Sequence, residues 1–151
     1  MVKNENTLSP NADLNFYELM RSTGAELKFS STAEAIESGQ VPTGVVSGLA
    51  GCLQTDCKDT LKLLKMSRST FYQRKRSGVL NSDEAYRVYR YVRLYTFAHT
   101  LFHGDADSAR EWLSRPAYAF RSKTPLQHAT TEIGAHEVET LIGRIRHGIP
   151  S

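Results

Sequence analysis

Cysteine is scarce in this sequence, with only Cys52 and Cys57 among 151 residues. Their spacing matches neither a CxxC motif nor a zinc site, because no second pair of ligands follows. Free cysteine is among the residue types most often found in protein interiors. We therefore expect both thiols to stay reduced and to pack in the core, with no disulfide and no bound metal.

Long hydrophobic runs are also absent. No stretch approaches the roughly 18 apolar residues that a membrane-spanning helix needs, and residues 1–6 lack the apolar core and cleavage site of a secretory signal. We expect a cytoplasmic protein without membrane contact. The hydrophobic fraction of 40% is typical of a globular chain, and the length suits one compact domain or two small modules.

Catalytic signatures are missing as well. The sequence contains no glycine-rich phosphate loop, no GxSxG elbow and no paired-carboxylate site. His99 and His103 have the spacing of the HExxH metal motif, but Thr100 stands where that motif has glutamate. Packing against a helix is the stronger interpretation of these histidines. The sequence therefore predicts no enzyme, no cofactor and no metal site.

Strand-like alternation is lacking, whereas helix start and stop signals are frequent, so we predict an all-α fold of about seven helices. Ser9-Pro10 predicts the start of a first helix. Ser31 and Glu34 predict a capping box for a second. The longest periodic stretch, residues 81–103, is the expected central scaffold. Thr124-Pro125 predicts a helix ending near Gly134, before a last amphipathic helix up to Gly148.

Two adjacent short helices show the order of caps and connecting residues that is typical of a helix-turn-helix. Asp56 or Thr55 is expected to cap the first helix, and Ser67 caps a second that ends at Gly78. A three-residue joint, Lys65-Met66-Ser67, connects them. This arrangement predicts a DNA-binding element.

Positive charge is concentrated around this element. Between Lys58 and Arg93 the chain carries ten Lys or Arg residues and three carboxylates, a local charge of +7, whereas residues 1–57 sum to −4 and residues 94–151 to zero. Segregated positive charge indicates a polyanionic partner.

The second short helix has the composition of a DNA-reading helix. Phe71 is the one large apolar residue placed to pack against the preceding helix, which turns short donors and acceptors outward. We expect base-edge or phosphate contacts from Arg68, Ser69, Thr70, Tyr72 and Gln73, and phosphate contacts from Arg74, Lys75 and Arg76. A solvated basic face is the plainer alternative.

Tyrosines and arginines also alternate along the scaffold helix, from Tyr86 to Tyr95. This composition is found in single-strand binders that stack bases on aromatic rings. Aromatic residues on a long helix are more often core or subunit contacts with arginines at their edges. We expect a scaffold and a dimer surface here.

Four motifs then follow in order: A-x-x-W-L-x-x-P from Ala109, T-P-L from Thr124, G-x-x-x-V from Gly134 and L-x-G-R-I-x-H-G from Leu141. With the helix-turn-helix, they make residues 40–151 resemble the Xre/MbcA/ParS antitoxins that accompany RES-domain toxins. The family usually has glycine where Lys65 stands, and Phe120-Arg121-Ser122 replaces a more usual Leu-Gly-Gly. Arg146 occupies a position that is often acidic.

The resemblance implies two functions. The helix-turn-helix would bind double-stranded operator DNA and autoregulate transcription, and the C-terminal helices would dock on the toxin and block its NAD-binding site. It implies a homodimer within a hetero-oligomeric complex. Its expected divisions are residues 1–39, an N-terminal helical extension; 40–103, the helix-turn-helix and dimerisation region; and 104–151, the toxin-binding domain. The toxin-facing residues would be Gly143, Arg144, Ile145, Arg146, His147, Gly148, Ile149, Pro150 and Ser151.

A stand-alone helix-turn-helix regulator without a toxin is the rival hypothesis. It shares the DNA-reading helix and differs only in what the C-terminal segment does. A pure inhibitor with an idle helix-turn-helix is a third possibility. Loss of toxin neutralisation without loss of DNA binding, on deletion of residues 144–151, distinguishes the antitoxin from the regulator.

Overall fold

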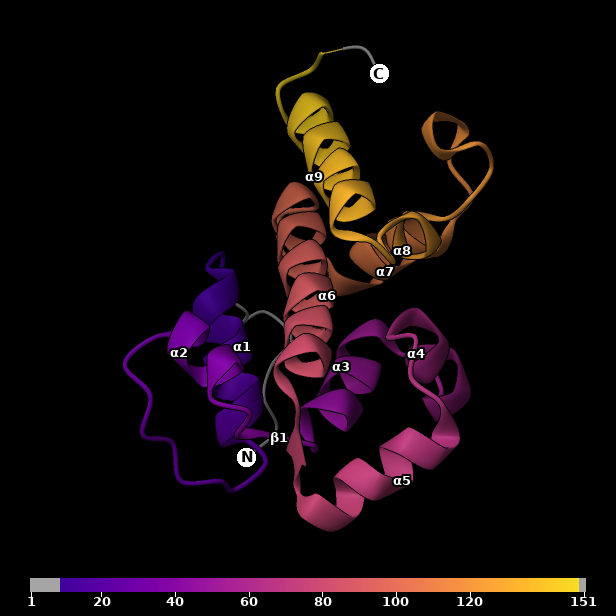
Figure 1. The fold of residues 1–151 in the computed structure, drawn as a ribbon. Coiled ribbons are helices and arrows are strands. Elements are labelled where there is room, and N and C mark those ends of the chain that lie inside the picture. Colours follow the sequence, from indigo (N-terminus) through magenta and orange to yellow (C-terminus); the bar gives the residue numbers. More distant parts are fainter. Residues whose placement is uncertain (1–8, 150–151) are drawn as a thin grey trace.

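The computed structural model describes residues 9–149, which are predominantly helical, as the sequence predicts (Figure 1). These residues form nine α-helices where about seven were expected. The helices are α1 (Ala12–Arg21), α2 (Thr32–Glu37), α3 (Val45–Leu53), α4 (Cys57–Leu63), α5 (Arg68–Ser77), α6 (Ser82–Leu101), α7 (Ala106–Ser114), α8 (Pro125–His128) and α9 (Glu132–Arg146).

A small antiparallel strand pair, which the sequence did not predict, connects two distant segments. Strand β1 (Val41–Pro42) pairs with β2 (Val79–Leu80), with Val41 opposite Leu80. Two residues are too few for a readable alternation of polar and apolar positions. The pair closes the base of the helix-turn-helix by bringing the start of α3 to the end of α5.

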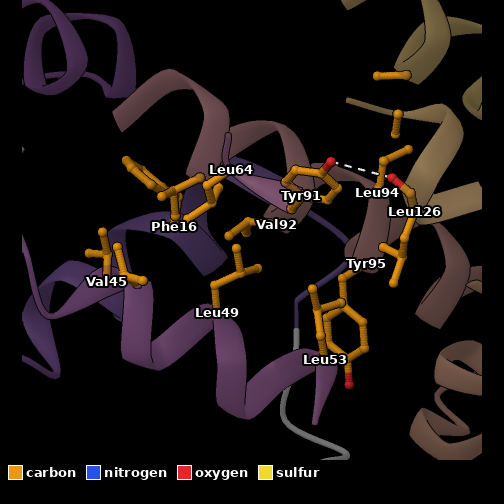
Figure 2. Close-up of a cluster of buried hydrophobic side chains, with 14 of the residues drawn as sticks. Phe16, Val45, Leu49, Leu53, Leu64, Tyr91, Val92, Leu94, Tyr95 and Leu126 are labelled. Atoms are coloured by element: carbon orange, nitrogen blue, oxygen red, sulfur yellow. Dashed lines mark hydrogen bonds between the residues drawn. The ribbon is translucent and has the colours of Figure 1, made fainter. Parts of the chain in front are cut away.

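The helix α6 is the central scaffold, as expected. Its N-terminus is closed by a capping box, in which Asn81 Oδ1 accepts from the Glu84 backbone N–H and the Glu84 carboxylate accepts from Asn81 N–H. Helices α1, α3, α7 and α9 all pack against it. One continuous core results, in which Phe16 of α1 and Leu49 of α3 are fully buried (Figure 2).

Tyr91 of α6 connects the two halves of the chain. Its ring is fully buried, and its hydroxyl lies 3.2 Å from the Leu63 carbonyl and 3.3 Å from the Leu126 carbonyl (Figure 2). Burial raises the pKa of Tyr91 well above its ordinary value of 10, so the hydroxyl stays protonated and can donate. The end of α4 and the start of α8 are thereby held to the same side chain.

Helix α1 is part of this core. Asn15 is buried, and its amide donates to Thr96 Oγ1 of α6 at 2.9 Å. The absence of side chains at Gly44 and Gly48 admits α1 to its place, because a Cβ at Gly48 would lie 2.4 Å from Leu19 Cδ1. The N-terminal segment therefore braces α3 and α6.

Two predicted helix starts were wrong in detail. Asn11 caps α1 in place of Ser9, because Asn11 Oδ1 accepts from the backbone N–H groups of residues 13 and 14. At α2, Ser31 is the cap, but the Glu34 carboxylate turns to Ser30 and does not complete the box. Ser31 therefore acts as predicted, and only the reciprocal bond from Glu34 differs.

Three further expectations differ from the structure. Cys57 is exposed at the start of α4 and Cys52 is half-buried, so the cysteines are not both core residues. The helix from Thr124 ends at His128, and Gly134 lies inside α9. A Cβ at Gly134 would lie 1.8 Å from the His128 carbonyl oxygen, so this glycine permits a close approach and does not end a helix.

Candidate functional site

The joint between α4 and α5 is formed by a left-handed residue. Lys65 has φ 52°, and the backbone N–H groups of Lys65 and Met66 donate back to Lys62 and Leu61. This pattern is a Schellman motif, in which glycine usually occupies the left-handed position. Met66 then enters the core, and Ser67 Oγ accepts from Thr70 N–H to begin α5. The predicted helix-turn-helix geometry is present.

Helix α5 presents most of the predicted DNA-binding residues to solvent. Phe71 is 7% exposed and holds the helix to the core, as expected, whereas Tyr72 on the adjoining face is 65% exposed. The Lys75 ammonium lies 5.9 Å from the Tyr72 ring centroid. The exposed predicted residues are Arg68, Ser69, Tyr72, Gln73, Lys75 and Arg76.

Arg74 and Thr70 are placed differently from the other candidates. The Arg74 guanidinium lies 2.7 Å from Glu84 Oε1, and the Glu84 side chain is only 6% exposed. The Arg74 carbonyl accepts from the Thr43 hydroxyl. Thr70 is half-buried, with its hydroxyl 3.0 Å from Ser67 Oγ. Arg74 thus ties α5 to α6 through Glu84, whereas the neighbouring Lys75 and Arg76 are exposed.

The arginines of the scaffold helix have partners inside the protein. Arg87 donates to the Leu64 carbonyl at 3.0 Å, next to the helix-turn-helix joint. Arg90 donates to the Thr130 carbonyl at 3.0 Å and pairs with Glu132 at 3.3 Å. The basic block therefore divides into an internal set on α6 and an exposed set on α4 and α5.

Arg93 is the centre of the contact between α6 and α9. Its guanidinium lies 2.9 Å from Glu132 and 2.5 Å from Glu139. Burial raises the pKa of Glu132, but hydrogen bonds from Tyr86 and Arg93 and the charge of Arg93 outweigh it, so the pKa lies below its ordinary value. Glu132 is therefore ionised at neutral pH, and with Glu139 it pairs with Arg90 and Arg93 of α6, which argues against single-strand binding by this helix.

The last turn of α9 carries most of the predicted toxin-facing residues. Gly148 has φ 68°, and the Gly148 and Ile149 N–H groups donate to the Ile145 and Arg144 carbonyls, forming a second Schellman motif. Ile145 is 42% and Ile149 54% exposed, and Gly143 is half-buried. Arg144, Arg146, His147 and Gly148 are exposed. Pro150 and Ser151 lie outside the described residues.

A pocket of about 440 Å³, which was not predicted from the sequence, adjoins this turn. Phe102 at the end of α6 and Trp112 of α7 form part of its wall, opposite Ile145 and Arg146. Trp112 of the A-x-x-W-L motif was the one sequence feature that could have indicated the pocket, because a half-buried tryptophan combines a large apolar surface with a polar N–H. The pocket extends the surface formed by the α9 terminus.

Among the described residues, no group of three or more His, Cys, Asp or Glu side chains could hold a metal ion. His99 is buried in the core, whereas His103 is exposed in the left-handed turn after α6. Within residues 9–149, no helix is long and apolar enough to cross a membrane.

The two candidate surfaces lie at opposite ends of α6. Figure 1 shows α5 at the lower end of the molecule and the α9 terminus at the upper end. The 20 residues of α6 span about 30 Å at 1.5 Å per residue. A molecule bound at one end therefore leaves the other accessible.

Two protein-family models match consecutive parts of the chain, one containing α5 and the other containing α9. An antitoxin Xre-like helix-turn-helix domain matches residues 33–93, and an antitoxin Xre/MbcA/ParS C-terminal toxin-binding domain matches residues 98–148. The Antitoxin Xre of Photorhabdus laumondii is 32% identical over 134 residues, which cover 88% of this chain and 90% of the relative.

Two further relatives match over shorter stretches. The Antitoxin Xre of Yersinia enterocolitica is 39% identical over 83 residues, 55% of this chain and 56% of the relative. That of Pseudomonas putida is 35% identical over 74 residues, 49% of this chain and 46% of the relative. The chain therefore belongs to the Xre-type antitoxin family, whose members are regulatory binding proteins and not enzymes.

Proposed function

We propose that this antitoxin covers the active site of a RES-domain, NAD-consuming toxin with the terminal turn of α9 and autoregulates its gene by binding operator DNA through α5. The observation that carries the proposal is the separation of two unlike exposed surfaces. One end of α6 presents cations and hydrogen-bonding side chains, and the other presents apolar side chains beside a pocket.

The DNA-binding surface combines α4 and α5. Lys58, Lys62 and Lys65 on the α4 side and Arg68 at the start of α5 are exposed and have no ion pair within residues 9–149. Such cations bind phosphates and release counterions, which supplies affinity without sequence preference. Gln73, exposed in the middle of α5, has the amide geometry that pairs with adenine in the major groove.

A single helix-turn-helix of this size covers one half-site. Helix-turn-helix proteins commonly bind two half-sites as dimers, and we propose a homodimer for this chain. The exposed side chains Leu14 and Tyr17 on α1 offer an apolar contact outside both binding surfaces. The toxin would join this dimer at the α9 termini.

The toxin-binding surface has the make-up of a protein interface. Ile145 and Ile149 supply an exposed apolar centre, and Arg144, Arg146 and His147 surround it with polar groups. An apolar centre within a polar rim is the usual anatomy of protein–protein contacts. The left-handed Gly148 directs Ile149 away from the helix axis and so defines its presentation.

Toxin binding is tested with a purified RES-domain protein, which we expect to be encoded beside this gene. Ile149→Asp should weaken binding about a hundredfold, because a carboxylate would enter an apolar contact, and should restore NAD consumption. Ile133→Asp is the matched control, since Ile133 is 76% exposed at the opposite end of the same helix. Equal binding by wild type and Ile149→Asp would refute the role of the α9 terminus.

DNA binding is tested with a fragment covering the region upstream of the gene. Arg68→Ala with Gln73→Ala should abolish specific binding, and Lys62→Ala should reduce the salt slope by about 1. Arg115→Ala is the control, because Arg115 is exposed at the end of α7 and belongs to neither α4 nor α5. Specific binding that survives the double substitution would show that α5 does not read the operator.

A further inference from the structure

The loop between α7 and α8 carries a fully exposed aromatic side chain. Tyr118 has 101% relative exposure, the highest among the large apolar residues of the described chain. It lies in a single 3₁₀ turn, Tyr118–Phe120, that projects from the fold (Figure 1). Exposed aromatic residues are costly to leave in water and are enriched at interfaces.

The loop is closed by its own hydrogen bonds. The Ala117 N–H donates to the Lys123 carbonyl at 3.0 Å, and the Ser122 N–H donates back to Ala117 at 3.1 Å. Phe120 N–H also donates to the Ala117 carbonyl, at 3.1 Å. Residues 117–123 therefore form a small closed unit whose backbone places Tyr118 at the tip.

This unit is fixed to α9 through aromatic stacking. Phe120 is buried, and its ring stacks on His128 with centroids 4.3 Å apart and planes inclined by 16°. His128 Nε2 lies 2.6 Å from a Glu137 carboxylate oxygen of α9. The position of Tyr118 is thereby tied to the helix that presents the toxin-binding turn.

The backbone of the loop holds two successive residues in the left-handed region. Arg121 has φ 53° and Ser122 has φ 66°, although neither is glycine. L-residues rarely adopt this conformation, and strained backbone occurs preferentially at functional sites. The strain is consistent with a loop whose shape serves recognition.

The charge of the loop is of one sign. Residues 112–131 contain three cations, Arg115, Arg121 and Lys123, and no carboxylate. Arg115 pairs with Glu111. Arg121 and Lys123 are exposed and have no ion pair among the described residues, which leaves two free cations beside Tyr118.

We propose that residues 117–123 form a second toxin contact, in which Tyr118 enters the toxin surface and Arg121 and Lys123 face acidic groups on it. The inference rests on the proposed function and extends it from one contact to two. Figure 1 shows the loop and the α9 terminus directed toward the same upper end of the molecule, away from α5. One partner can therefore engage both.

The experiment measures binding of the full-length chain to the purified RES-domain protein by titration calorimetry and surface kinetics. Tyr118→Ala should raise the Kd about tenfold or more, chiefly through faster dissociation. Arg121→Gly combined with Lys123→Ala should lower the association rate at low salt and flatten its salt dependence. Glycine suits φ 53°, so this variant should keep the fold.

Ile133→Ala is the control, because Ile133 is 76% exposed at the start of α9 and belongs to neither proposed toxin contact nor to the proposed dimer contact. If Ile149→Asp weakens binding while both loop variants bind as wild type, the loop proposal is overturned and the proposed function stands. If the wild type does not bind the RES-domain protein, both are overturned. Weakening by Tyr118→Ala, without change in thermal unfolding or in the Ile133→Ala control, supports the second contact.

Discussion

Replacing Arg93 by methionine should separate the structural role of the α6 arginines from nucleic-acid binding. Methionine keeps an unbranched stem of similar length but removes the guanidinium that joins Glu132 and Glu139 of α9. Arg90 retains its bond to the Thr130 carbonyl, so α6 and α9 remain partly connected. The variant tests whether the positive charge at Arg93 acts inside the protein.

The expected loss of stability follows from the two contacts. Glu139 is 18% exposed, and its charge-assisted bond to Arg93 at 2.5 Å contributes about 2 kcal/mol, since the carboxylate would be left partly buried without a partner. The contact with Glu132 is discounted to about 0.5 kcal/mol because that side chain is 48% exposed. The total is about 2–3 kcal/mol, or a melting temperature lower by about 5–10 °C for a chain of this size.

Urea unfolding of Arg93→Met, Glu139→Gln and the double variant measures this energy. The cycle should return a coupling of about 1–2 kcal/mol between the two residues. Arg21→Met is the control, because its 3.7 Å pair with Glu18 is exposed and should change stability by no more than about 0.5 kcal/mol. Unchanged stability of Arg93→Met together with lost operator binding would refute the internal role.

Gly134→Ala should destabilise the fold by about 3 kcal/mol or more, because its Cβ would collide with the His128 carbonyl oxygen; Gly143→Ala in the same helix, with open space around it, should be neutral or stabilising in the same unfolding assay. Lys65→Gly should raise stability by about 0.5 kcal/mol by relieving the left-handed strain, while the salt slope of operator binding falls by about 1; a loss of stability would contradict this. The lowered pKa of Glu132 stabilises the fold above the unfolded-state pKa, and this contribution is lost as pH falls through the folded-state pKa; unfolding at pH 6 and pH 3 should show the loss, and Glu132→Gln should reduce it.

Most of the helical architecture could be predicted from local chemistry. Ser67 caps α5 as the sequence indicated, and Asp56, one of two expected caps, begins α4, because each side-chain oxygen satisfies an N–H group only three residues away. Gly78 likewise ends α5 in the left-handed conformation. Such signals depend on neighbours in the chain and need no knowledge of the fold.

The predictions that were wrong concern positions whose structure depends on residues distant in the sequence. Gly134 was interpreted as a helix terminator, but its role is to admit the His128 carbonyl. Cys57 was expected in the core because of its residue type, yet the first turn of α4 faces solvent. The strand pair joins residues 41–42 to residues 79–80, which are distant in sequence. The packing of the fold brings these two-residue strands together, so no local pattern predicts them.

The candidate sites show the same division. The sequence was sufficient to predict the helix-turn-helix, the exposed face of α5 and the C-terminal motifs, because residue type and helical spacing define them. The sequence did not predict which basic side chains lack an internal partner, because nothing in it distinguishes the ten basic residues between Lys58 and Arg93. Folding brings Glu84 to Arg74 and Glu132 to Arg90 and Arg93, and a charge already paired inside a protein is not available to a partner.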